Sequence, residues 1–396
     1  METMIVVLRN VLLWLGPVLW LGATPEVREW TSADGAARFS GTLLEVADET
    51  ALIRREADQQ TFTVPLENLS PSDRDWIQAW AQEQARSEKV TPSSPDAPES
   101  MDWPRRIRVG PDYAIEVIEE NRAEHRFVYR SNHFEFISDR ALARGVVREF
   151  GQIFEGTYLS IAAMPLGWNP QPPEGDHFVV RLFAEREAYY AAGGLPRSGG
   201  VYLSHRRECL VPFESIGLER LSSTYALTGS SNIRILVHEV THQVHHEWIA
   251  RLPIWLVEGL AVYMESVPYE RGVFRFDRQN RRNFFLERSG REAVFVPLGE
   301  MLAMSGREWN TMLTTGHPQT RQNYATAFLL AWYFFHLEDE GRSLYRYLRA
   351  IERGTPEPEA RLLLLGDRDV AGLTSDFTQR MQRQGLRLQP WTNPAP

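Results

Sequence analysis

Two neighbouring stretches decide the fold of this chain: SNIRILVHEVTHQVHHEW at residues 231–248 and LPIWLVEGLAVY at residues 252–263. In the first stretch, Ile, Leu and Val recur at three- and four-residue steps, which is the period of an amphipathic helix. Ser230 or Ser231 can cap that helix. In the second stretch, Pro253 suits the start of a helix, and apolar residues follow it. The sequence therefore predicts two consecutive helices joined by a short turn.

The first helix carries the motif His238-Glu239-Val240-Thr241-His242. Residues four apart lie one above the other on a helix, so both imidazoles can reach one ion. Glu239 is offset to the side, where its carboxylate can hold a water molecule without being a ligand. The motif predicts a metal site with His238 and His242 as ligands and Glu239 as general base. The alternative is a surface helix with solvated His and Glu side chains.

The second helix supplies a candidate third ligand, because Glu258 is the only charged residue between Arg251 and Glu265. An unpaired carboxylate in an apolar environment is costly, and coordination of a cation removes that cost. Gly259 weakens the helix by about 1 kcal/mol relative to Ala, which indicates a close approach to the first helix. Two imidazoles and one carboxylate leave a fourth position for water, and this set without thiolates predicts Zn²⁺.

Three nearby residues are alternatives for roles at this site. His245 and His246 follow the motif, but His246 lies about 12 Å of helix from His238. That distance excludes a three-His site on one helix, and we interpret both residues as neighbours of the ligands or as solvated. Glu265 is a candidate to orient a ligand imidazole.

Composition limits the class of protein. The 396 residues are 43% hydrophobic and 24% charged, which indicates a folded chain of two or three domains and argues against disorder or a multi-span membrane protein. The formal net charge of −9 argues against a nucleic-acid partner. Cys209 is the single cysteine, which excludes a disulfide framework within the chain and any Cys-rich metal site.

The N-terminus has the pattern of an export signal. Arg9 is followed by an apolar run at residues 11–23, which has the length of a signal-peptide core and is short for a membrane span. We therefore expect residues 1–23 to be a signal peptide and the protein to be periplasmic or secreted, without a stable membrane span after cleavage. The alternative is an uncleaved signal that anchors the protein in the membrane.

Turn and linker residues divide the remainder. Residues 26–83 are predicted to form a small β-rich domain that ends in a helix capped by Ser70. Its strands are expected at residues 38–46, 50–55 and 60–64. Residues 84–104, rich in Ser, Pro and acidic residues, are predicted to be a linker. Residues 105–386 are expected to form one large α/β-type unit, followed by a tail at 387–396.

The two helical stretches resemble the gluzincin (peptidase MA-like) metallopeptidases. The likeness is to poorly characterised bacterial families in which H-E-x-x-H precedes W-L-x-E-G-x-A-x-Y, here His238–His242 and Trp255–Tyr263. It extends weakly over most of residues 125–350, through Glu185, Tyr189-Tyr190, Gly199-Gly200-Val201-Tyr202 and Tyr324. Fifteen residues separate His242 from Glu258, fewer than in the best-known gluzincins. The resemblance implies an α+β, zincin-like domain with a mixed sheet and active-site helices.

For function, this resemblance implies a zinc-dependent peptidase acting on protein or peptide substrates, with Zn²⁺ held by His238, His242 and Glu258. Glu239 would act as general base, and Tyr324 would stabilise the oxyanion; packing in the core is the alternative for Tyr324. A sheet edge would align the substrate as an added strand, and we expect that edge at residues 208–213. The alternative function is a non-catalytic zincin-like scaffold or binding protein docked to a partner by its N-terminal domain.

Residues 26–83 resemble the Sla-type homology domain, a small SH3-like β-barrel. The matching residues are Glu29-Trp30-Thr31-Ser32, Asp34-Gly35, Val64-Pro65-Leu66, Leu69-Ser70 and Asp73. Such domains are similar to peptide-binding modules. The resemblance therefore implies a peptide or protein partner for this domain, with a role as spacer or docking module as the alternative.

Overall fold

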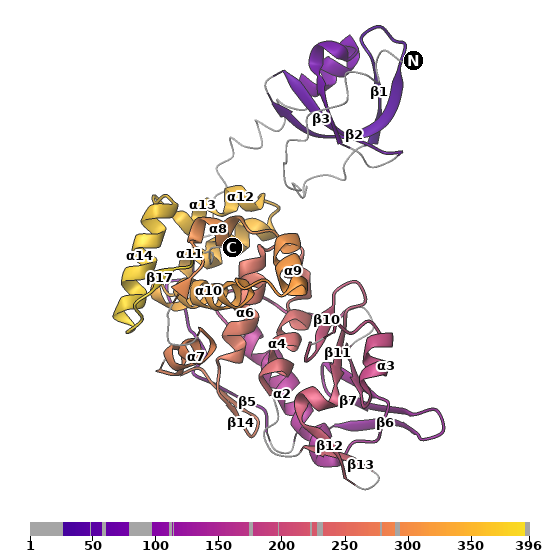
Figure 1. The fold of residues 1–396 in the computed structure, drawn as a ribbon, viewed down its shortest axis with the longest axis vertical. Coiled ribbons are helices and arrows are strands. Elements are labelled where there is room, and N and C mark those ends of the chain that lie inside the picture. Colours follow the sequence, from indigo (N-terminus) through magenta and orange to yellow (C-terminus); the bar gives the residue numbers. More distant parts are fainter. Residues whose placement is uncertain are drawn as a thin grey trace. The chain divides into compact units, whose positions relative to one another are not determined.

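A computed structural model describes most of the chain (Figure 1): residues 27–47, 49–57, 61–78, 97–110, 113, 115–173, 177–196, 198–221, 224–227, 233–277, 279–289 and 294–392. The predicted signal peptide, most of the predicted linker and the caps predicted at Ser230 and Ser231 lie outside these residues. Helices and strands both contribute, so the fold is mixed α+β, as predicted. The chain divides into two compact units, Met1–Pro95 with Arg349–Ala360 and Asp96–Leu348 with Arg361–Pro396.

The first unit contains a four-stranded antiparallel sheet in the order β1-β2-β3-β4. Its strands are β1 (Val27–Thr31), β2 (Arg38–Ala47), β3 (Thr50–Arg55) and β4 (Thr61–Pro65). The three predicted strands are confirmed to within a residue at each end, and β1 is additional. A bulge between Leu43 and Glu45 shifts the register of β2 against β3, which bends the strand.

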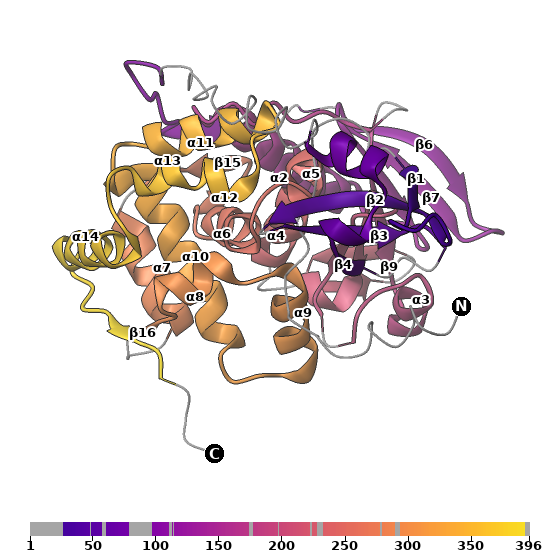
Figure 2. The ribbon, with the colours of Figure 1, turned by 90° about the horizontal axis from the view of Figure 1, so that it is seen from above.

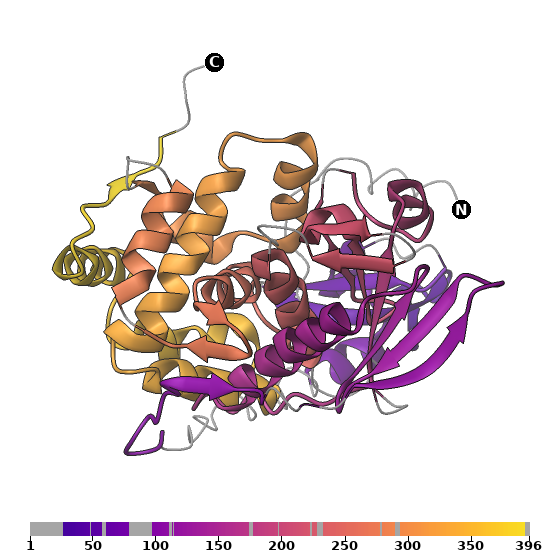
Figure 3. The same cartoon turned by 90° about the horizontal axis from the view of Figure 1, so that it is seen from below.

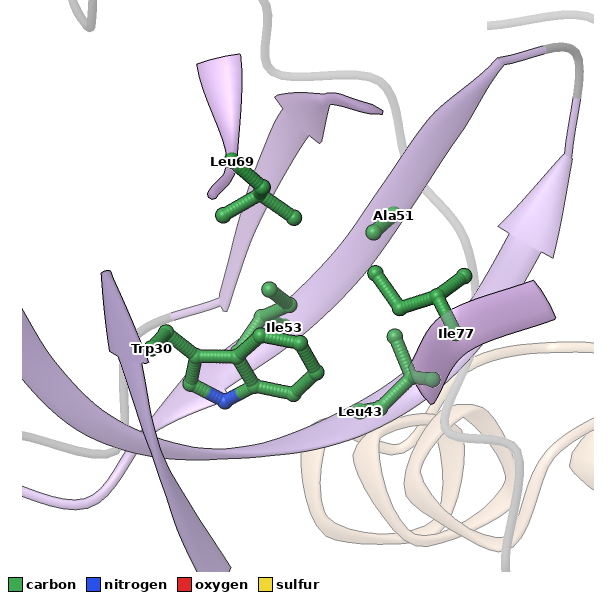
Figure 4. Close-up of a cluster of buried hydrophobic side chains, with 6 residues drawn as sticks. All are labelled: Trp30, Leu43, Ala51, Ile53, Leu69 and Ile77. Carbon is green, nitrogen blue, oxygen red and sulfur yellow. The ribbon is translucent and has the colours of Figure 1, made fainter. Parts of the chain in front are cut away.

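A compact apolar core holds this sheet against the helix at residues 71–78 (Figure 4). Its buried members are Trp30, Leu43, Ala51, Ile53, Leu69 and Ile77. Burying each large side chain stabilises the fold by roughly 1.5–3 kcal/mol. The predicted cap is present, because the backbone N–H of Asp73 donates to Ser70 Oγ at 3.2 Å. Arg28 donates to Asp73 Oδ1 at 2.7 Å and so ties the start of this helix to β1.

The second unit is built around a mixed six-stranded sheet in the order β10-β11-β9-β8-β7-β6. Its strands are β6 (Glu116–Asn121), β7 (Arg126–Arg130), β8 (Phe134–Ser138), β9 (Phe178–Phe183), β10 (Val201–Leu203) and β11 (Glu208–Pro212). Strand β9 is parallel to both β8 and β11. Parallel neighbours need a long crossover, and helix α2 (Arg144–Ala162) supplies it between β8 and β9; Figure 3 shows α2 beside the sheet.

The expected position of the sheet edge is wrong. Strand β11, where it was predicted, pairs with β10 on one side and with β9 on the other. The edge on this side of the sheet is the three-residue strand β10, and β6 forms the other edge. Strand β10 has only three residues, between the turns at residues 198–200 and 204–207. An alternation this short does not show where the strand lies in the sheet, so its position at the edge was not predicted.

Three helices build the centre of the second unit (Figure 2). Helix α6 (Ile254–Glu265) packs against both α4 (Ile233–Val244) and α10 (Thr320–Trp332). Nine of the twelve residues of α6 are buried, which explains why its sequence is apolar on almost every side. The predicted helix at 231–248 is interrupted, because α4 ends at Val244 and a single turn, α5 (His246–Ile249), follows.

Gly259 on α6 allows a close approach, but to a different helix from the one predicted. A Cβ at this position would lie 2.5 Å from the carbonyl oxygen of Ala327 on α10. From the sequence, Gly259 is expected to approach α4, the helix that carries the HExxH motif. The partner is instead the backbone of α10, some 70 residues further along the chain, which no local pattern identifies.

Gly259→Ala is expected to lower the free energy of unfolding by about 1–3 kcal/mol, because the added methyl overlaps a backbone atom that cannot rotate away. Gly145→Ala on α2 is the matched control, since nothing lies within 4 Å of a Cβ there. Ala favours a helix over Gly, so the control should be neutral or stabilising. Equal stability of the two variants in urea unfolding would contradict the packing of α6 on α10.

The end of the predicted linker packs within the second unit. Trp103 Nε1 donates to the carbonyl of Glu340 at 2.8 Å, and its ring stacks on Phe335. Arg342 donates to the carbonyl of Glu99 at 2.8 Å. The second unit therefore begins before residue 105. In the described part of the chain, no helix combines the length and apolar character needed to cross a bilayer.

Candidate metal centre

Helices α4 and α6 bring His238, His242 and Glu258 together. The two imidazole Nε2 atoms lie 3.1 Å apart, and Glu258 Oε2 lies 3.4 Å from His238 Nε2 and 3.6 Å from His242 Nε2. Ligands placed tetrahedrally at about 2.0–2.1 Å from one zinc ion would be separated by about 3.3–3.4 Å. Among the described residues, this is the only group of three or more His, Cys, Asp or Glu side chains with such convergence.

Local packing fixes the two helices that carry these donors. Leu236, Val237, Val240 and Val244 are buried on α4. The remaining side of α4 presents its two motif imidazoles to α6, one helical turn apart. Pro253, predicted as the first helical residue, is the N-cap of α6, so the helix begins one residue later, at Ile254. The short segment between α5 and α6 reverses the chain, so that Glu258 returns to the level of the imidazoles.

Glu258 has the environment of a cation ligand. Its Oε2 atom is buried and has no hydrogen-bond partner within the described part of the chain. Burial alone would raise the pKa of Glu258, but the imidazoles of His242 and His238 hold this pKa well below its usual range. The carboxylate is therefore charged, and a cation at this point would satisfy its orphaned oxygen. The donor set of two nitrogens and one oxygen fits Zn²⁺.

Glu265 and Arg288 hold the His238 ring in place. Glu265 Oε1 accepts a hydrogen bond from His238 Nδ1 at 2.5 Å, and Arg288 Nη1, on α7 (Gln279–Ser289), donates to Glu265 Oε2 at 2.6 Å. A proton on Nδ1 leaves the lone pair of Nε2 free for a metal. Glu265 thus makes the contact with a ligand imidazole that was considered for it from the sequence. Arg288 was missed, because no local pattern connects α7 to this site.

Glu239 lies beside the three donors and is held by the edge strand β10. Its Oε2 accepts the backbone N–H of Tyr202 at 2.9 Å. Burial raises the pKa of Glu239 above its usual range. A Cβ on Gly199 would lie 2.5 Å from Ile235 Cδ1, and one on Gly200 would lie 3.2 Å from Glu239 Cγ. The glycine pair therefore allows the strand to approach α4 closely enough for this hydrogen bond.

The three donors, Glu239 and Tyr324 on α10 line one cavity, which has a volume of about 700 Å³. The Tyr324 ring centroid lies 6.2 Å from that of His238, and Trp309 packs edge-to-face against this ring at 4.9 Å. Burial, followed by the charge of Glu258, raises the pKa of Tyr324 above its usual range. The phenol is therefore protonated at neutral pH and can donate a hydrogen bond. Its contact with Trp309 is the core packing considered as the alternative, and its role at an oxyanion stays a prediction.

His245 and His246 do not join the three donors. His245 is 1% exposed, and its Nδ1 bonds to the carbonyl of Thr241. Burial lowers the pKa of His245 to about 3, which keeps the ring neutral. His246 Nδ1 pairs with the hydroxyl of Tyr202 at 2.7 Å. Each ring thus has a protein partner, and of the two interpretations from the sequence, solvation does not describe either residue.

Comparison of the sequence with known proteins assigns no function to this site. No protein-family model matches the chain, and no curated protein matches it. The class of site is therefore defined by its donors: two imidazoles and a carboxylate that converge, with a second carboxylate, Glu239, beside them.

Proposed function

We propose that the protein is a secreted or periplasmic zinc-dependent peptidase with a zincin-like second unit. His238, His242 and Glu258 would hold Zn²⁺, and proteins or peptides would be its substrates. The observation that carries the proposal is the near-tetrahedral spacing of three donors from two helices, one of them a buried carboxylate oxygen that accepts no hydrogen bond from the described residues. A structural zinc site would use four protein ligands, whereas three leave a position for chemistry.

The side chains around the donors have defined tasks in such a reaction. A zinc ion bound there would lower the pKa of a water molecule and polarise a peptide carbonyl. Glu239, oriented by the Tyr202 N–H, accepts a proton from the attacking water and passes it to the leaving amine. The Tyr324 hydroxyl donates a hydrogen bond to the developing oxyanion. Strand β10, at one edge of the sheet, would align an extended substrate through the outward backbone groups that Glu239 does not use.

The non-catalytic scaffold is the second candidate and has less support. A scaffold needs the fold and the metal, but it does not need a buried carboxylate oriented beside them. For the first unit, the resemblance of residues 26–83 and the four-stranded sheet support an SH3-like barrel that binds a peptide or protein partner or acts as a spacer. Digestion of a library of blocked peptides by the purified protein tests the peptidase proposal. Absence of cleavage by zinc-loaded protein would favour the scaffold.

The cavity lining indicates which substrates would fit. Ile249 on α5 and Ile254 and Val257 on α6 contribute apolar side chains to its lining. Arg234 and Glu287, which pair with each other at 3.4 Å, also line it. We therefore expect one side of the cleaved bond to carry an apolar side chain.

Ile254→Asp is expected to lower kcat/KM for peptides with an apolar residue at that position by about 10–200-fold, because a charge at this half-buried position replaces an apolar contact of roughly 1–3 kcal/mol. Leu362→Asp, on α13 (Leu362–Leu365), is the control; Leu362 is 61% exposed and does not line the cavity. Cleavage profiles of both variants check the prediction. An unchanged preference in Ile254→Asp would exclude this wall as a determinant of specificity.

A further inference from the structure

Two buried imidazole nitrogens next to the metal centre have no partner. His242 Nδ1 and His245 Nε2 both make no hydrogen bond to any group in the described residues. The two ring centroids are 5.7 Å apart. A buried polar nitrogen without a partner costs about 1–3 kcal/mol, so two neighbouring ones indicate an interaction that involves both.

The two nitrogens have complementary hydrogen-bonding roles. His242 directs Nε2 toward His238 and Glu258, so as a metal ligand it carries its proton on Nδ1 and needs an acceptor. His245 directs Nδ1 at the carbonyl of Thr241, which only accepts, so the proton of His245 is on Nδ1. The Nε2 lone pair of His245 therefore needs a donor. His242 Nδ1 is therefore a donor without an acceptor, and His245 Nε2 is an acceptor without a donor, among the described residues.

A third unpartnered group lies beside His245. The indole Nε1 of Trp168 is buried without a partner among the described residues, and the Trp168 ring lies 6.3 Å from the His245 ring. The indole N–H only donates. One water molecule accepts two hydrogen bonds and donates to a third group, and buried waters typically make about three. Such a molecule would satisfy His242, Trp168 and His245 together.

We propose that His245 is a positioning residue for the metal ligand His242, whose Nδ1–H it accepts through one buried water molecule that also takes the Trp168 N–H. This inference rests on the proposed metal site. The two ligand imidazoles would then be oriented by groups of different chemistry. A charged carboxylate, Glu265, orients His238, whereas a neutral imidazole orients His242. His245 does not contact substrate or metal.

The zinc dissociation constant of His245→Leu tests the role of His245, measured by competition with a chromophoric chelator. Loss of a partner that orients a ligand typically weakens metal binding by about 10–100-fold, and we expect an increase in this range. His245→Gln, which restores an acceptor, should recover most of the affinity. His246→Gln is the matched control and should bind zinc as the wild type does, because His246 pairs with Tyr202.

The outcomes separate this inference from the proposed function. A wild type that binds no zinc would remove the metal site itself. Tight zinc binding by the wild type with equal affinity in His245→Leu would overturn only the role of His245. If His245→Leu does not fold, ¹⁵N NMR of the histidines in the zinc-loaded wild type decides. Protons on Nδ1 of both His242 and His245 support the proposal, and a proton on His245 Nε2 overturns it.

Discussion

Glu239→Gln is expected to lower kcat/KM by about 10²–10⁴-fold while zinc remains bound. The substitution keeps the size of the side chain, and its amide oxygen can still accept the Tyr202 N–H. An amide does not accept the proton of the attacking water, which is the contribution that a general base makes to the rate. Initial rates on a blocked peptide, measured with zinc content determined on the same samples, check this result.

Glu247→Gln is the matched control for this experiment. Glu247 lies on α5, eight residues further along, with a side chain that is 58% exposed. This variant should cleave at the wild-type rate. Wild-type activity in Glu239→Gln would show that another group is the base, or that the cleavage comes from a contaminant. Zinc binding without hydrolysis in the wild type would favour the scaffold over the peptidase.

Glu258→Ala is expected to weaken zinc binding by about 10²–10³-fold. Structural zinc sites with four ligands bind with roughly 10–16 kcal/mol, or about 3–4 kcal/mol for each ligand. Removal of the carboxylate also leaves two imidazoles without the anion that balances a divalent charge. The measurement is zinc stoichiometry after equilibrium dialysis at micromolar free zinc.

Thermal unfolding gives a second reading of the same substitution. A ligand that binds only the folded state stabilises it, so zinc should raise Tm of the wild type and have little effect on Glu258→Ala. Glu270→Ala is the control, because the Glu270 side chain is 64% exposed. Stoichiometric zinc in Glu258→Ala would remove this residue from the donors and would leave the peptidase proposal without its third ligand.

Local patterns predicted much of the candidate site. The HExxH spacing placed two imidazoles on one helical face, because that relation depends only on residues four apart. The isolation of Glu258 among apolar residues indicated a special role, and the structure brings it to the imidazoles. Helix α6 and strands β2, β3 and β4 likewise follow from patterns within single segments.

Relations between distant segments were not predictable. Arg288 reaches Glu265 from another helix, and the contact of Gly259 with Ala327 joins residues 68 positions apart. The order of strands in the sheet placed β10 at the edge, whereas the sequence analysis placed the edge at β11. Side-chain tautomers, on which the role of His245 depends, are set by the acceptors that tertiary packing supplies.

The proposed function depends on the convergence of His238, His242 and Glu258 on one divalent cation. Crystals of the protein grown with zinc, with anomalous data collected at the zinc absorption edge, test it most directly. We expect one strong peak per chain within about 2.0–2.2 Å of both Nε2 atoms and a Glu258 oxygen. A peak held by other residues, or no peak between α4 and α6 in zinc-soaked crystals, would contradict it.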